Sequence, residues 1–139
     1  MNPPSPLAAG ALVFAGGGAG ALLRHVLGRA MTGWFGPAAM TAFPWATLTV
    51  NVTGSLAMGL LAGWLVRHGQ DAAAASDHWR LLLGVGLLGG YTTFSSFSLE
   101  MMLLIERGQG GLAFAYAAIS VIAALIGLYI GLILMRLAA

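Results

Sequence analysis

The residues best suited to chemistry lie in segment 89–98, which reads Gly-Gly-Tyr-Thr-Thr-Phe-Ser-Ser-Phe-Ser within a long apolar stretch. Two adjacent glycines followed by a run of hydroxyl side chains weaken a helix in its interior. If the helix breaks there, its freed carbonyls need partners inside the protein, and in transporters such carbonyls bind a cation. Alternatively, the serine and threonine hydroxyls bond back to their own helix. Both interpretations stay open at this point.

Two phenylalanines and a carboxyl group share one stripe of this segment. Phe94, Phe97 and Glu100 are three residues apart and therefore lie on one face of a helix. Phenylalanines in a membrane helix usually face lipid, but a carboxyl group on the same stripe weakens that interpretation. The edge of a phenyl ring is electropositive, so a pair of edges can line the path of a small anion without trapping it.

Polar stripes also cross two other apolar stretches. Thr47, Asn51 and Ser55 recur at intervals of four, and Tyr116 and Ser120 make a shorter stripe of the same kind. The amide of Asn51 offers two N–H donors, which suits an anion. Its oxygen could equally bond a neighbouring helix, so both uses remain open.

Arg24 lies late in the first apolar stretch. A charge at such a position must face protein, water or the membrane interface. It either draws anions toward a vestibule or extends along the lipid to the interface.

The parts of a catalytic site are missing from the sequence. His25, His68 and His78 fall near helix ends or in a connection, and neither an HExxH nor a GxSxG motif occurs. Asp71 and Asp77 lie in the most polar connection, where we expect them to be solvated. The chain has no cysteine, which excludes disulfides and thiolate sites. We therefore expect a protein that is not an enzyme.

The composition is that of a membrane protein. Only 7% of the 139 residues are charged, whereas soluble domains have about 25%. Hydrophobic residues make up 59%, and the chain has no lysine. The six arginines are scattered singly, so no basic stripe is available to bind nucleic acid.

Four stretches approach or exceed the roughly 20 apolar residues that a spanning helix needs. They predict an all-α membrane protein with one domain over residues 1–139 and helices at Leu7–Met31, Trp45–Val66, Trp79–Ile105 and Gly111–Met135. The first stretch lacks a basic flank and is followed by three comparable ones, so we expect a mature helix rather than a signal peptide.

Local signals mark the helix ends. Pro44 suits the first turn of the second helix, Ser76 or Asp77 could cap the third, and Gly108 is a plausible C-cap of the third. Four tryptophans fall at or just beyond the predicted ends, as in an interfacial aromatic belt: Trp34, Trp45, Trp64 and Trp79.

Each predicted helix carries a pair of glycines four residues apart. Such spacing lets helix backbones approach closely in lipid, and four pairs predict a tightly packed bundle or oligomer. The pairs are Gly16 and Gly20, Gly59 and Gly63, Gly86 and Gly90, and Gly127 and Gly131.

The arginines do not favour one orientation in the membrane. Arg67, Arg80 and Arg136 would lie on the side of the two termini, and the other three on the opposite side: Arg24, Arg29 and Arg107. An excess of positive residues on one side of the membrane sets the orientation of the chain. With three arginines on each side, this rule predicts no preferred orientation. Either the chain inserts both ways, which would allow antiparallel dimers, or another signal decides.

Three segments together resemble the signature stretches of the Fluc (CrcB) fluoride channel family, in the order found in that family. They are residues 17–25 (GGAGALLRH), 47–55 (TLTVNVTGS) and 89–97 (GGYTTFSSF). The resemblance covers essentially the whole chain. It implies a fluoride channel that exports the ion passively, located in the plasma membrane of a bacterium. It further implies a dual-topology, antiparallel homodimer with two pores and a break in the third helix.

The resemblance also assigns roles to individual residues. Backbone carbonyls of Gly89 and Thr92 would hold a structural sodium ion at the dimer axis. The implied pore residues are Asn51, Thr93, Phe94, Ser96, Phe97, Tyr116 and Ser120, with Arg24 in a vestibule. A further hydroxyl is expected at position 124, but this chain has Ala124 there.

Two other kinds of membrane protein remain as alternatives. A proton-coupled small multidrug exporter also has four helices, but it needs a carboxyl group deep in the first helix, and residues 7–31 contain no Asp or Glu. A structural subunit of a membrane complex would carry no ion flux of its own.

Overall fold

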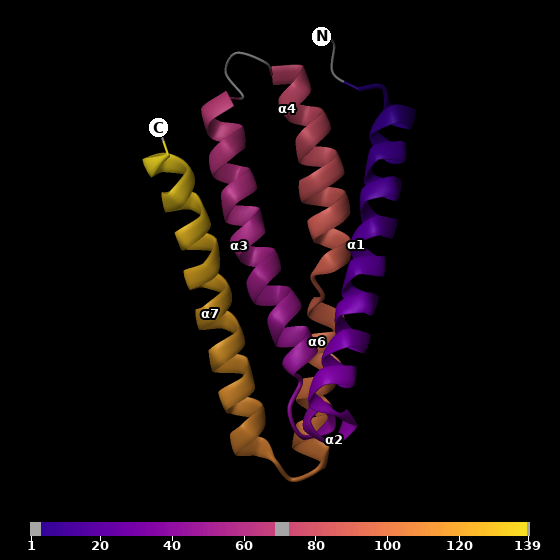
Figure 1. The fold of residues 1–139 in the computed structure, drawn as a ribbon, viewed down its shortest axis with the longest axis vertical. Helices are drawn as coiled ribbons and strands as arrows, with labels where there is room; N and C mark the ends of the chain where they lie inside the picture. Colours follow the sequence, from indigo (N-terminus) through magenta and orange to yellow (C-terminus); the bar gives the residue numbers. More distant parts are fainter. Residues whose placement is uncertain (1–3, 69–72, 139) are drawn as a thin grey trace.

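The computed structural model describes residues 4–68 and 73–138. Four long helical segments run side by side in alternating directions (Figure 1). The helices are α1 Pro6–Phe35, α2 Pro37–Ala42, α3 Trp45–His68, α4 Ala73–Trp79, the π-helix η1 Arg80–Leu88, α5 Gly89–Tyr91, α6 Phe94–Glu106 and α7 Gly110–Leu137. Within the described residues, α1, α3, the segment Ser76–Glu106 and α7 are long and apolar enough to cross a membrane.

The ends of α1 follow from its sequence. The Ser5 hydroxyl oxygen accepts the N–H of Ala8 at 3.3 Å, and Pro6 occupies the first helical position, where its missing N–H costs nothing. The helix continues one turn beyond the predicted end at Met31 and stops at Gly36, whose φ of 82° suits glycine. Pro37 then begins α2, a short helix that the periodicity did not indicate.

Two of the predicted caps need revision or refinement. The prediction that Ser76 or Asp77 caps the third span is wrong, because the helix already begins at Ala73 and both residues lie inside α4. The Asp77 carboxylate instead pairs with Arg80 at 3.2 Å. Pro44 immediately precedes α3, and its carbonyl accepts the N–H of Leu48 at 3.1 Å. Asp71 lies outside the described residues.

The predicted C-cap at Gly108 lies one residue beyond the cap in the structure. Arg107 caps α6, and Gly108 follows with a φ of 73°. The N–H of Gln109 then bonds the carbonyl of Leu104 at 2.9 Å, which closes the turn from α6 to α7.

The first and third spans meet at their glycines. A methyl group on Gly16 would collide with the carbonyl oxygen of Leu82, and one on Gly20 with that of Leu87. From the other side, a Cβ on Gly86 would lie 2.9 Å from the Cα of Gly16. This backbone contact therefore depends on glycine in both helices.

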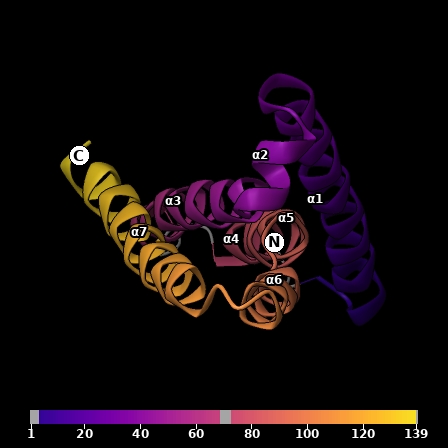
Figure 2. The same ribbon diagram turned by 90° about the horizontal axis from the view of Figure 1, so that it is seen from below.

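A second backbone contact joins α3 to α7. Gly59 and Gly63 of α3 and Gly127 and Gly131 of α7 are all buried. A Cβ on Gly131 would meet the carbonyl of Leu56, and one on Gly59 the carbonyl of Leu128. The glycine pairs thus assemble two close helix pairs, and Figure 2 shows α1 and α7 at opposite sides of the bundle with α3 between them.

The third span is irregular where the other three are not. Nine residues form a π-helix, which is rare at this length. After three residues of α-helix, Thr92 and Thr93 have extended backbone angles, and α6 begins at Phe94. We call Thr92 and Thr93 the junction.

The outer faces of the bundle are apolar, as a bilayer requires. Large side chains point outward along the first and last spans, among them Phe14, which is 84% exposed, and Leu125. Among the described residues, the largest fully buried side chains are Tyr116 and Val50.

Candidate functional site

Asn51 of α3 holds the backbone of the junction. Its Oδ1 accepts the N–H of Thr93 at 2.8 Å, and its Nδ2 donates to the carbonyl of Thr93 at 3.1 Å. The side chain therefore does bond a neighbouring segment, which was one of its two expected uses. One of the two amide N–H groups remains for another acceptor.

The Thr93 side chain caps the following helix. Its Oγ1 accepts the N–H of Ser96 at 3.2 Å and lies 3.1 Å from the Ser96 hydroxyl, which satisfies a donor at the start of α6.

These two contacts release two carbonyls. In a regular α-helix, the carbonyl of Gly89 would accept the N–H of Thr93 and that of Thr92 the N–H of Ser96. Asn51 and the Thr93 hydroxyl take those N–H groups instead. The carbonyls of Gly89 and Thr92 are thus among those that lose their α-helical donors at the junction.

A pocket of about 270 Å³ lies between α3, the junction with α6, and α7. Its lining residues are Asn51, Ser55, Thr92, Thr93, Phe94, Phe97, Ser120, Val121 and Ala124. We call it the inner pocket. It brings together five of the seven predicted pore residues, from three separate helical segments. None of its lining residues carries a positive charge.

Ser120 is the most unusual member of the inner pocket. Its side chain is only 6% exposed, and its hydroxyl has no hydrogen-bond partner within the described part of the chain. Buried polar groups are nearly always bonded, so an unpaired one calls for an explanation such as a bound water or ion. The free hydroxyl can donate to an anion in the pocket.

The two phenylalanines occupy different depths. Phe97 is half-buried and packs with its ring centre 5.1 Å from that of Tyr116. Phe94, 5.7 Å from Phe97 between ring centres, is 79% exposed at the outer surface of the chain. The Phe97 ring packs against the buried cluster that contains Tyr116, whereas the Phe94 ring is exposed at the outside of the chain.

Glu100 forms a polar cluster that the sequence analysis did not include among the pore residues. Its Oε1 accepts the Thr47 hydroxyl at 2.6 Å, and its Oε2 accepts the Tyr116 hydroxyl at 2.8 Å. Tyr116, fully buried, thus directs its hydrogen toward Glu100. The signal was available, because Thr47 shares a stripe with Asn51 and Glu100 shares one with the two phenylalanines.

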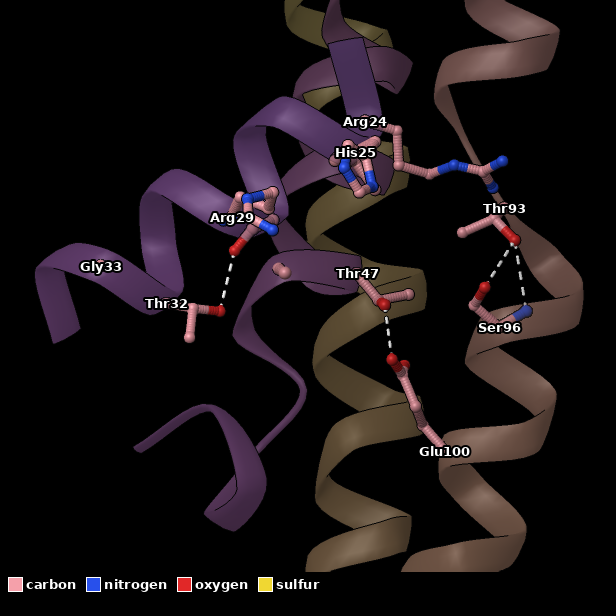
Figure 3. A pocket seen from close by; sticks show the side chains of 12 residues that line it. Arg24, His25, Arg29, Thr32, Gly33, Thr47, Thr93, Ser96 and Glu100 are labelled. Atoms are coloured by element: carbon pink, nitrogen blue, oxygen red, sulfur yellow. Dashed lines mark hydrogen bonds between the residues drawn. The ribbon is translucent and has the colours of Figure 1, made fainter. Parts of the chain in front are cut away.

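A larger pocket of about 680 Å³ opens beside this cluster (Figure 3). We call it the outer pocket. Arg24, His25 and Arg29 of α1 line one wall, and Thr47, Ser96 and Glu100 line another. Figure 3 shows Arg24 reaching toward the wall that α6 forms. Thr93 lines both pockets, so the two meet at the junction.

Side-chain metal sites do not account for these features. Among the described residues, no group of three or more His, Cys, Asp or Glu side chains lies close enough to hold a metal ion. The junction offers oxygen atoms of another kind, backbone carbonyls and the hydroxyls of Thr92 and Thr93.

The chain is similar to known proteins over its whole length. The family model described as "CrcB-like protein, Camphor Resistance (CrcB)" matches residues 11–132. A relative from Erythrobacter litoralis, named "Fluoride-specific ion channel FluC", is 50% identical over 139 residues, which is all of both chains. A relative of the same name from Novosphingobium aromaticivorans is 54% identical over 130 residues, covering 94% of this chain and 98% of its own. One from Caulobacter vibrioides is 46% identical over 125 residues, covering 90% and 93%. With four spans and a match over this length, the protein is a multi-pass membrane protein that belongs to the CrcB-like family.

Proposed function

We propose that this protein is a fluoride-selective channel that lets fluoride leave the cell passively and so lowers its intracellular concentration. The observation that carries the proposal is the inner pocket, where the buried hydroxyl of Ser120, unpaired among the described residues, lines the same space as the amide of Asn51 and two phenyl rings. The names of the relatives, each a fluoride-specific ion channel, agree with it.

The chemistry of the inner pocket suits a small, strongly hydrated anion. Fluoride loses its water only if replacement donors are available, since an unpaired buried charge is very costly. Neutral hydroxyls, an amide N–H and ring edges supply such donors, whereas a fixed cation inside the pore would trap the ion. Arg24 and Arg29 lie in the outer pocket instead, where they raise the local anion concentration without binding it permanently.

The cluster around Glu100 sets a condition on this pathway. Both carboxylate oxygens already accept a hydroxyl, one from Thr47 and one from Tyr116. For the Tyr116 hydroxyl to serve fluoride, its hydrogen must turn away from Glu100. The hydroxyl of Ser120, one turn further along α7, has no partner among the residues that the structure describes, so it can serve fluoride without any rearrangement.

The complete channel, in this proposal, is an antiparallel homodimer of chains inserted in both orientations. The arginine tie supports it, because the two orientations then have similar free energies. The exposed ring of Phe94 supports it as well, since a second subunit would cover that ring and close the side of the inner pocket.

We further propose that the junction is a functional break whose carbonyls hold a structural sodium ion between the subunits. Gly89 and Thr92 fit this role, because their carbonyls have lost their α-helical donors and Gly89 is exposed on the surface of the subunit. The two subunits of a dimer would together contribute four backbone carbonyl oxygens. Uncharged carbonyls suit a monovalent cation, as unwound helices of transporters use them for sodium.

Removing sodium should therefore weaken the dimer. A ligand at 100 times its Kd stabilises the state that binds it by about 2.7 kcal/mol. We expect prolonged exchange of sodium for N-methylglucamine to destabilise the detergent-solubilised dimer by a factor of about 100, so that subunits exchange correspondingly faster between two fluorescently labelled populations. Returning sodium should restore it. Unchanged subunit exchange after prolonged depletion would rule out the sodium site.

Fluoride efflux from liposomes that contain only this protein tests the main proposal. A multidrug exporter would move organic cations in exchange for protons, and a structural subunit would move nothing. The first of these alternatives is also disfavoured because α1 contains no acidic side chain.

A further inference from the structure

We propose that the line of hydroxyl donors crosses from α7 to α3 after Ser120, with the Ser55 hydroxyl binding fluoride where α7 offers only Ala124. This inference rests on the proposed function and adds a residue to the same pathway. Ser55 lies on a polar stripe with Thr47 and Asn51, and the sequence alone assigns it no role. The departure at Ala124 left the far end of the pathway without a donor.

Ser55 lies at the correct depth in the inner pocket. It lines that pocket together with Ser120 and Ala124. The helices α3 and α7 run in the same direction beside each other (Figure 1). Their register follows from Gly127, where a Cβ would lie 3.2 Å from the carbonyl of Val52 and 3.6 Å from the N of Leu56. Ser55 therefore lies beside the turn of α7 that begins at Ala124.

The Ser55 hydroxyl is free to act as a donor. Hydroxyls within membrane helices usually bond back to a carbonyl one turn earlier. Thr53 does so toward Thr49 at 2.7 Å, and Ser98 toward Phe94 at 2.9 Å. Ser55 is half-buried and makes no hydrogen bond with any residue that the structure describes.

The inner pocket thus contains two hydroxyls without a partner among the described residues, that of Ser55 and the more deeply buried one of Ser120. Ser120, more than nine-tenths buried, has no partner among the described residues and lines the same space. The spare N–H of Asn51 lies one helical turn before Ser55 on α3. The remaining lining near Ala124 is the apolar side chain of Val121. Beyond Ser120, neither of the other α7 residues that line the inner pocket, Val121 and Ala124, has a side-chain hydroxyl.

Replacing Ser55 should slow fluoride without disturbing assembly. A hydrogen bond to a charged group contributes enough that its loss changes an equilibrium or rate by about tenfold or more. We expect Ser55→Ala to reduce fluoride efflux from liposomes about tenfold at low fluoride, while the purified protein elutes as a dimer like wild type. Ser55→Thr, which keeps a hydroxyl, should conduct within about threefold of wild type.

A rescue variant tests whether Ser55 acts as a hydrogen-bond donor or only fills space in the pocket. Ser55→Ala combined with Ala124→Ser returns one hydroxyl to the same pocket from the facing helix, and we expect it to recover most of the lost flux. Ser98→Ala is the matched control, because Ser98 lines neither pocket and its hydroxyl bonds its own helix. We expect this control to conduct like wild type.

The possible failures are distinguishable. Normal efflux in Ser55→Ala, or reduced efflux that Ala124→Ser does not restore, would overturn the role of Ser55 while leaving the channel intact. A wild-type protein that conducts no fluoride would overturn the proposed function itself and this inference with it.

Discussion

Two lysines added beside Gly108 and Gln109 are expected to abolish fluoride efflux in cells that make only that variant. Six arginines divide three and three between the two sides of the membrane, so two further positive charges decide the orientation. All subunits would then face one way, and an antiparallel dimer could not form. Two lysines added to the connection 67–78 should fix the opposite orientation and abolish efflux equally.

Producing the two lysine variants together should restore efflux, because each supplies the orientation that the other lacks. Reporter fusions at the C-terminus give the side of the membrane for each variant, and vesicle efflux gives the activity. Glutamines added at the same positions are the matched control, since they change length without charge. The antiparallel dimer is wrong if one lysine variant conducts normally while its reporter shows a uniform orientation.

Phe97→Ile is expected to reduce fluoride efflux by about 100-fold, equivalent to about 2.7 kcal/mol in the barrier, with the dimer intact. Isoleucine fills much of the same volume but lacks the electropositive ring edge. Phe97 lines the inner pocket, with its ring centre 5.7 Å from that of Phe94 and 5.1 Å from that of Tyr116, so the ring borders the space through which an anion would pass.

Phe14→Ile is the matched control for this substitution. Phe14 lies on the outer face of α1, 84% exposed, and lines neither the inner nor the outer pocket. The control should match wild type in both elution volume on size-exclusion chromatography and fluoride efflux. Phe97→Ile should match wild type in elution volume but not in efflux. Wild-type efflux from a dimeric Phe97→Ile protein would show that the Phe97 ring takes no part in the fluoride pathway.

Composition was sufficient to locate the four spans, because a span is recognised from the apolar residues of one continuous stretch of sequence. The glycine pairs were equally informative: Gly16 and Gly86 do meet across α1 and η1, since a helix contact that excludes Cβ atoms leaves a spacing visible in the sequence. The π-helix of Arg80–Leu88 and the short helix α2 were not predicted, because neither has a periodicity of its own.

Long-range contacts explain what could not be predicted about the candidate site. The pairing of Asn51 with the backbone of Thr93 joins residues 42 apart, and that of Thr47 with Glu100 joins residues 53 apart. Stripes identify which side chains share a face, but not which partner each face meets. The release of the Gly89 and Thr92 carbonyls became visible only when the donors taken by Asn51 and Thr93 were known.

The central claim is tested most directly by fluoride efflux from liposomes that contain only the purified protein. Potassium fluoride is trapped inside, valinomycin carries the compensating potassium, and a fluoride electrode records release; potassium chloride vesicles serve as the control. A passive fluoride channel empties the fluoride vesicles rapidly without any proton gradient, while chloride stays trapped. Fluoride release no faster than from protein-free liposomes, or equal release of chloride, would contradict the account.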